Sequence, residues 1–204
     1  MPGRKIIFVF CLICFASSAS REQQPPRPKP ASNGSGAPQR VAHPPKPAAD
    51  GPSLEVTMKF IQDKMNDIGP LNYTVTTHHV DGSWSVTLEL SNVVADLGRC
   101  IITYHEHIST TIEGFKPQDR DGVLDLKTVK KITVQSMEQE MNDLDRDRGQ
   151  IWTFRPPMFH IGVLQSRKGG QYFIADEEEL ATRLARAMTR AVELCTPDKK
   201  PEPF

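Results

Sequence analysis

The sequence predicts an α+β domain made of an N-terminal helix, an antiparallel curled sheet of about seven strands and a closing C-terminal helix. Two observations support this fold class. Apolar residues recur at steps of three and four near both ends of residues 53–196, and between these two stretches they alternate with polar residues. No helical pattern separates successive strands, which favours an antiparallel over a parallel sheet.

The first helix is predicted for residues 54–68. Ser53 is the expected N-cap, because its hydroxyl can accept a hydrogen bond from a free backbone N–H. Gly69, followed by Pro70, is the expected left-handed end of the helix. The apolar positions that would share one helix face are Leu54, Met58, Ile61, Met65 and Ile68.

Seven strands are predicted after this helix. The first two, residues 73–80 and 84–90, form a hairpin around the turn signal Asp81-Gly82. The clusters KPQDRDG and RKGG are interpreted as turns, and residues 138–148 as a charged connection between strands. The other five strands are expected at residues 100–111, 124–134, 151–154, 159–165 and 172–175.

The last helix is predicted for residues 176–195. Asp176 and Glu179 have the spacing of an N-terminal capping box. Alanines along the apolar side would allow the helix to lie close to a sheet. The apolar arc is expected to contain Leu180, Leu184, Ala187, Met188, Ala191 and Cys195.

This order of elements resembles a pleckstrin-homology-like roll, in which the last helix closes one open end of a bent sheet. The resemblance covers residues 73–195, and the stretch FIADEEELATRLARAMTRAVELC is also similar to the closing helix of small uncharacterised exported bacterial proteins. It is a resemblance of architecture and implies a fold. Phosphoinositide-binding members carry basic residues around the first hairpin, whereas this hairpin reads THHVDGSW, so lipid-headgroup binding is not implied.

The N-terminal residues predict export. Arg4 and Lys5 precede an apolar run at residues 6–16, which is too short to span a bilayer and has the pattern of a secretory signal peptide over residues 1–20. The mature chain is therefore expected to be secreted or periplasmic, without a membrane span. Residues 21–52 carry nine prolines and predict a disordered spacer. The domain is expected at residues 53–196, followed by a flexible tail at residues 197–204.

The charge of the domain argues against a nucleic-acid-binding protein. Residues 53–204 carry 23 acidic and 18 basic side chains, whereas the spacer carries 2 acidic and 5 basic ones. Nucleic-acid-binding domains usually show an excess of basic residues. A protein or an envelope component is the expected kind of partner.

Two cysteines remain after removal of the signal peptide, Cys100 and Cys195. Both lie on apolar faces, Cys100 on a strand and Cys195 on the closing helix, so the two thiols are expected to meet where that helix packs on the sheet. An exported protein favours the oxidised state, and the sequence therefore predicts a structural disulfide. The alternative is a pair of free buried thiols.

Two motifs resemble metal sites. His105 and His107 in YHEH point to one side of a strand and could chelate Zn²⁺ or Cu²⁺, with His78 and His79 as further donors, although a stable site needs three or four ligands. The ordinary interpretation is a solvated strand face. The run DLDRDRGQ begins like a calcium loop, but Arg148 and Phe154 stand where the loop needs glycine and glutamate.

Three arginines lie on the last helix, at the edge of its apolar arc: Arg183, Arg186 and Arg190. They predict either an anion-binding rim or a solvated helix flank. The usual signatures of hydrolases, phosphate loops and dinucleotide-binding folds are missing, and no cofactor is expected. The preferred function is a non-enzymatic exported binding domain. The alternatives are a small exported enzyme whose site is built from sequence-distant residues, and a metal-binding module centred on the two strand histidines.

Overall fold

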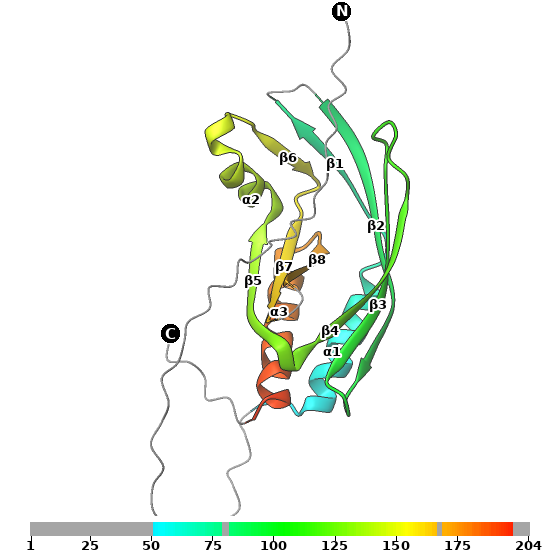
Figure 1. The fold of residues 1–204 in the computed structure, drawn as a ribbon, viewed down its shortest axis with the longest axis vertical. Helices are drawn as coiled ribbons and strands as arrows, with labels where there is room; N and C mark the ends of the chain where they lie inside the picture. The colour runs from blue at the N-terminus through cyan, green and yellow to red at the C-terminus, as the bar shows by residue number, and fades with distance from the viewer. Residues whose placement is uncertain (1–50, 79–81, 167–168, 198–204) are drawn as a thin grey trace, which may run out of the picture. The chain divides into compact units, whose positions relative to one another are not determined.

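The computed structural model describes residues 51–78, 82–166 and 169–197, and Figure 1 shows their arrangement. A compact unit begins at Pro52. The predicted signal peptide, nearly all of the predicted spacer and the residues after 197 lie outside the described residues.

The helices and strands follow one another along the chain in this order. The elements are α1 (Leu54–Asp67), β1 (Leu71–Thr77), β2 (Gly82–Asp96), β3 (Ile101–Thr110), β4 (Gln118–Asp125), β5 (Val129–Ser136), α2 (Met137–Leu144), β6 (Trp152–Arg155), β7 (Phe159–Gln165), β8 (Gly169–Ala175) and α3 (Glu178–Cys195), with 3₁₀ turns η1 (Leu126–Thr128) and η2 (Arg146–Arg148).

The strands form two antiparallel sheets, which confirms the α+β class but not the single curled sheet or barrel. One sheet has five strands in the order β4-β3-β2-β1-β6, and the other has three in the order β5-β7-β8. The strand predicted at residues 124–134 is wrong as one element, because η1 interrupts it and its two halves enter different sheets. The sheets therefore face each other without closing into a barrel (Figure 1).

Helix α1 has the predicted face and the predicted N-cap. Ser53 Oγ accepts a hydrogen bond from the Val56 N–H at 3.3 Å, and Gly69 adopts a left-handed φ of 64°. The helix also supports β2 where a bulge interrupts the pairing of β2 with β3. There the Asn66 side-chain amide donates to the Val93 carbonyl and accepts from the Val93 N–H, both at 3.0 Å.

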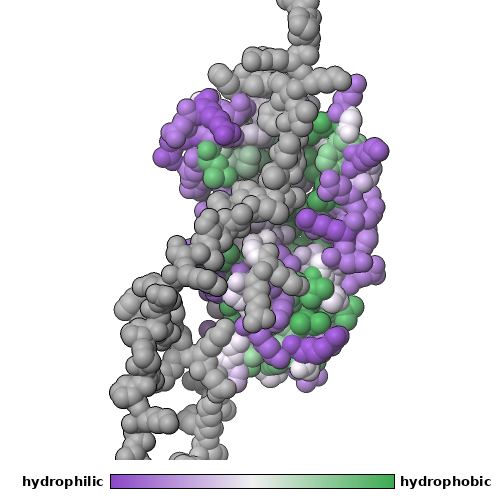
Figure 2. All heavy atoms as spheres, viewed as in Figure 1, coloured by the Kyte–Doolittle hydropathy of each residue, from purple (hydrophilic) through white to green (hydrophobic). Residues whose placement is uncertain are grey.

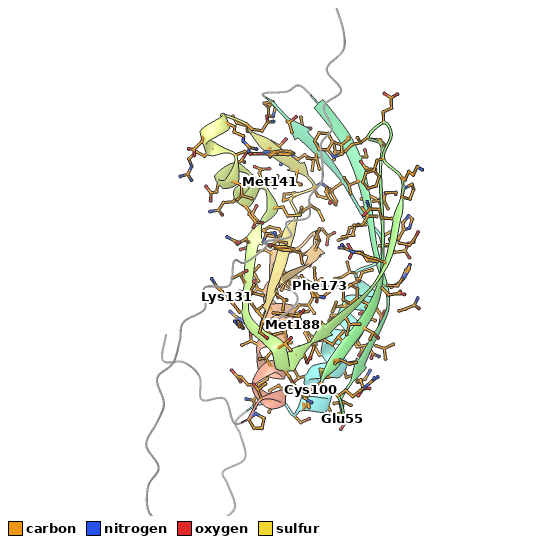
Figure 3. The ribbon with its side chains drawn as sticks, viewed as in Figure 1. Glu55, Cys100, Lys131, Met141, Phe173 and Met188 are labelled. Carbon is orange, nitrogen blue, oxygen red and sulfur yellow. A yellow bond between two sulfur atoms is a disulfide. The ribbon has the colours of Figure 1, made fainter. Side chains whose placement is uncertain are left out.

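The main core lies between the two sheets and helices α1 and α3. Phe173 from β8 and Met188 from α3 point into it, as Figure 3 shows. The apolar arc predicted for the last helix is confirmed as partly or fully buried, but the capping box is wrong: α3 begins at Glu178, and its N-cap Glu177 makes no side-chain capping bond. The side chains from the helices that are fully buried include Met58, Ile61, Met65, Ala181, Met188 and Ala191.

A second core lies at the other end of the five-stranded sheet and is covered by α2. The sequence assigned residues 138–148 to a connection, and this assignment is wrong, because they contain α2 and η2. Met141 faces inward from α2 (Figure 3) and packs with Met137 against this core. Asn142 holds β6 in place by accepting from the Trp152 N–H at 2.7 Å and donating to its carbonyl at 3.1 Å.

None of the helices in the described residues is both long and apolar enough to cross a membrane.

Candidate functional site

A hollow lies between the edge strand β5 and the helix α3. The 3₁₀ turn η1 separates β5 from β4, and the Asp125 carboxylate caps this turn by accepting from the Lys127 N–H at 3.0 Å. Beyond the turn, β5 pairs with β7, and no second strand pairs with it within the described residues. Its other edge is therefore the outer edge of the three-stranded sheet, on the side where α3 packs.

A groove of about 340 Å³ runs between β5 and α3. Its apolar part comes from alternate residues of β5 and from one alanine of α3, whereas its polar part comes from α3 alone. This arrangement arises because α3 turns its arginine-bearing flank, and not only its apolar arc, toward the edge of the sheet. The lining residues are Ile132, Val134, Thr182, Ala185, Arg186, Thr189, Arg190 and Glu193.

Arg190 brings a partly satisfied guanidinium group to this groove. Its Nη1 donates to Glu193 Oε2 at 3.2 Å. Its Nε–H is buried and has no hydrogen-bond acceptor among the described residues. A buried donor without an acceptor is costly, by about 1–3 kcal/mol. The Arg190 side chain is 24% exposed, so its accessible part, and not the buried Nε–H, is what a ligand oxygen in the groove would meet.

The three arginines predicted as an anion-binding rim do not all line the groove. Arg186 and Arg190 line the groove. Arg183 instead lies over the Phe60 ring of α1, with its guanidinium carbon 5.5 Å from the ring centroid. Helical spacing alone does not explain the separation, because Arg183 lies only about 20° from Arg190 on the helix circumference, at 100° per residue. Anion binding stays a prediction for Arg186 and Arg190, and Arg183 supplies a matched control outside the groove.

The predicted disulfide between Cys100 and Cys195 is present. It joins the corner before β3 to the last residue of α3, with the two Cα atoms 6.0 Å apart. In Figure 3 Cys100 lies beside the end of α3. The bond therefore fastens the helix that forms one wall of the groove. Both cysteines are buried, so the disulfide is a structural feature of the core.

The two strand histidines pair with aspartates on β4. His105 Nδ1 lies 2.9 Å from Asp121 Oδ1, and His107 Nδ1 lies 2.8 Å from Asp119 Oδ1, across registered positions of β3 and β4. We call these four residues the His–Asp ladder. Figure 2 shows hydrophilic residues along this margin of the five-stranded sheet. Nothing in the sequence pattern singled out the two aspartates, because KPQDRDG was interpreted as a turn.

The ladder shifts two pKa values in opposite directions. The hydrogen bond with Asp121 is the main cause of a raised pKa for His105. The hydrogen bond with His107 is the main cause of a lowered pKa for Asp119. A raised histidine pKa stabilises the fold below the ordinary histidine pKa and loses that effect as the pH rises through the folded value. A lowered aspartate pKa stabilises the fold above its ordinary value of 3.8 and loses that effect as the pH falls through the folded value.

We therefore expect the ladder to stabilise the fold most between about pH 4 and pH 6.5, the ordinary pKa values of its members. The variant His105→Gln should reduce the free energy of unfolding more at pH 5 than at pH 8, as measured by urea denaturation. His78→Gln is the control, because the exposed His78 makes no ion pair with a described residue. A loss for His105→Gln that is equal at both pH values would contradict the assignment.

The metal-site predictions gain no support from the geometry. Across the described residues, no group of three or more His, Cys, Asp and Glu side chains is arranged to hold a metal ion. In the segment DLDRDRGQ, which begins like a calcium loop, Asp143 pairs with Arg146, and Asp145 pairs with Arg148 at 3.0 Å. Asp145 also accepts a hydrogen bond from the Trp152 indole at 2.9 Å. These carboxylates serve the connection between α2 and β6.

An ion pair joins the buried Glu106 of β3 to the exposed Arg120 of β4. Glu106 accepts two hydrogen bonds from Arg120, from Nε at 2.8 Å and from Nη2 at 2.9 Å. As expected, Glu106 faces away from the two strand histidines. Burial, with a smaller effect of the Glu106 charge, raises the pKa values of Tyr73 and Tyr104 to about 12. These tyrosines stay protonated at any physiological pH and are core residues.

His160 of β7 is a buried histidine that contacts Glu140 of α2. Its Nδ1 lies 2.8 Å from Glu140 Oε2 of α2, and its Nε2 is buried without a partner among the described residues. A histidine oriented by a carboxylate is the arrangement of a general base. The His160 side chain is only 6% exposed, however, and burial lowers its pKa. As the chain is folded, this pair anchors α2 on the three-stranded sheet and cannot reach a substrate.

Sequence reasoning missed the β5 half of the groove. Ile132 and Val134 show the alternation of an ordinary strand, and no local signal marks that strand as an edge beside α3. Sequence reasoning did single out Arg186 and Arg190, but only as members of a set of three. No protein-family model, no curated protein and no solved structure matches this chain, so the pleckstrin-homology-like resemblance stays a prediction.

Proposed function

We propose that this chain is an exported binding domain and that the groove between β5 and α3 binds its ligand. The observation that carries the proposal is the composition of the groove. An apolar part from Ile132 and Val134 lies beside two guanidinium groups, and the Arg190 Nε–H still lacks an acceptor. Ligand sites typically combine an apolar lining with a few well-placed polar groups. The expected ligand is an anion with an apolar portion.

The same composition argues for binding rather than catalysis. Acid–base catalysis needs a group that exchanges a proton near the working pH. The arginines of the groove remain charged in proteins, and the carboxylate of Glu193 is paired with Arg190. The Thr189 hydroxyl donates to the Ala185 carbonyl, and among the described residues no hydrogen bond joins Thr182 or Thr189 to Glu193. The groove can therefore hold and orient an anion, but its lining offers no route for proton transfer.

Export rests on three points. The first residues have the pattern of a signal peptide, the residues after it have the composition of a spacer, and the domain contains a disulfide. Disulfides persist in oxidising compartments and are rare in reducing ones. We place the domain in a periplasmic or extracellular setting, where the predicted spacer at residues 21–52 would act as a tether. A protein or envelope component with acidic groups is the expected partner.

The proposal can be tested by NMR titration of the chain purified after secretion. The probes are inorganic phosphate, citrate and a hexaglutamate peptide, with hexaglutamine as the neutral comparison. Amide shifts are expected on β5 and α3 with at least one anion, and they should disappear in the double variant Arg186→Gln/Arg190→Gln but persist in Arg183→Gln. Shifts that map elsewhere, or no shifts with any anion, would refute the groove as the ligand site.

A further inference from the structure

We infer that the ligand of the groove is an extended peptide that carries acidic side chains at alternate positions and adds to β5 as a fourth strand. This inference rests on the proposed function and names the chemistry of its partner. It begins with the edge of the three-stranded sheet. Strand β5 pairs with β7 alone among the described strands, so its second edge has backbone groups that no strand satisfies. Such an edge is a template for the addition of an extended chain.

The spacing of the groove fits an extended chain. Side chains on one face of a strand repeat every second residue, at about 6.6–6.8 Å. Arg186 and Arg190 are four residues apart on α3, a rise of about 6 Å along the helix. Two acidic side chains at positions i and i+2 of a bound strand would therefore meet one arginine each.

The charge of β5 selects among possible occupants. Lys130 and Lys131 are exposed, and Lys131 lies on the outer side of the strand in Figure 3. A second copy is a poor occupant, because β5 has no acidic residue that could pair with these lysines, and parallel pairing of two β5 strands would bring the lysines side by side. The proline-rich residues 21–52 are also unsuited, since they are basic and prolines lack the N–H that strand addition needs. An acidic segment of another protein meets neither obstacle.

The test uses a fluorescein-labelled peptide, Gly-Thr-Glu-Thr-Glu-Thr-Gly-amide, and fluorescence anisotropy with the secreted chain at low salt. Three altered peptides separate the contribution of the acidic side chains to binding from that of the backbone hydrogen bonds. One replaces both Glu by Gln, and two carry N-methyl groups on alternate backbone nitrogens, one version for each register. Hydrogen bonds to charged groups are worth about 1.5–3 kcal/mol, which corresponds to roughly tenfold or more in affinity.

We expect the Gln peptide to bind at least about tenfold more weakly and one of the two N-methylated peptides to lose binding, since only one edge of the added strand bonds to β5. Arg190→Gln should weaken binding about tenfold, whereas Arg183→Gln, which removes the same charge from the same helix, should change it less than about twofold.

The possible failures differ in what they overturn. If citrate or phosphate shifts the groove amides while the peptide does not bind, strand addition is wrong and the groove function stands. The same holds if neither N-methylated peptide loses affinity. If the peptide binds equally to Arg190→Gln and to the unchanged chain, both the peptide inference and the groove assignment are wrong. No binding by any of these probes also refutes both.

Discussion

Removing the Cys100–Cys195 disulfide is expected to lower the free energy of unfolding by about 4–5 kcal/mol, the largest effect we predict. The two cysteines are 95 residues apart in sequence, so the bond restricts a long loop in the unfolded chain. In the chain-entropy account the stabilisation grows with the logarithm of the loop length. Urea denaturation of the double variant Cys100→Ala/Cys195→Ala, compared with the oxidised chain, measures the difference.

Reduction of the unchanged chain provides the control for this experiment, because it opens the same loop without shortening either side chain. The reduced chain and the double variant should show similar unfolding midpoints. Alkylation before and after reduction tests the bond directly, since neither thiol should react in the folded, oxidised chain. A difference in unfolding free energy below about 1 kcal/mol would show that the bond does not restrain the unfolded state as the entropy account requires.

The second large effect is expected at Gly122 of β4. Its position lies under the ring of Tyr104 on the neighbouring strand, and the two residues are direct partners in the register of β3 and β4. A Cβ atom at residue 122 would lie 2.0 Å from the Tyr104 Cζ atom. Real contacts of this length do not occur, and the Tyr104 ring also makes an edge contact with Phe173, with ring centroids 5.1 Å apart.

We therefore expect Gly122→Ala to cost about 3 kcal/mol, at the upper end of typical overpacking. Gly170→Ala on β8 is a matched control, because its Cβ would meet the Tyr172 ring at an ordinary 3.7 Å. That variant should change the free energy of unfolding little. In a Tyr104→Leu background, Gly122→Ala should cost less, since the ring that blocks the Cβ has gone. Equal losses for the two alanine variants would contradict the steric explanation.

The composition of β4 explains why this strand escaped detection in the sequence. Residues 118–122 read Gln-Asp-Arg-Asp-Gly, which has the composition of a turn. In the fold they form an edge strand whose polar side chains find partners on β3. Arg120 pairs with Glu106, and Asp119 and Asp121 pair with the two histidines. Such pairings depend on residues more than ten positions away, so a local pattern does not report them.

Helix α2 was missed for a related reason. It is short, its exposed side is acidic, and none of its residues is fully buried. Two signals were present in the sequence. Ser136 can cap the helix, and its Oγ accepts from the Gln139 N–H at 3.4 Å. Met137 and Met141 are four residues apart and pack on the second core. One turn of apolar spacing is too weak to distinguish a helix from a charged connection without the surface against which it packs.

The sequence by itself determined the features that depend on local periodicity and on compartment. The faces of α1 and α3, the first hairpin, the antiparallel α+β class and the Cys100–Cys195 bond are of this kind, because burial of an apolar face imposes its period on the chain. The tertiary structure alone decided that the strands divide into two sheets and where each of the three arginines lies. Strand pairing and helix packing join residues far apart in sequence. Only in the folded chain do Arg186 and Arg190 lie beside β5, while Arg183 lies over the ring of Phe60.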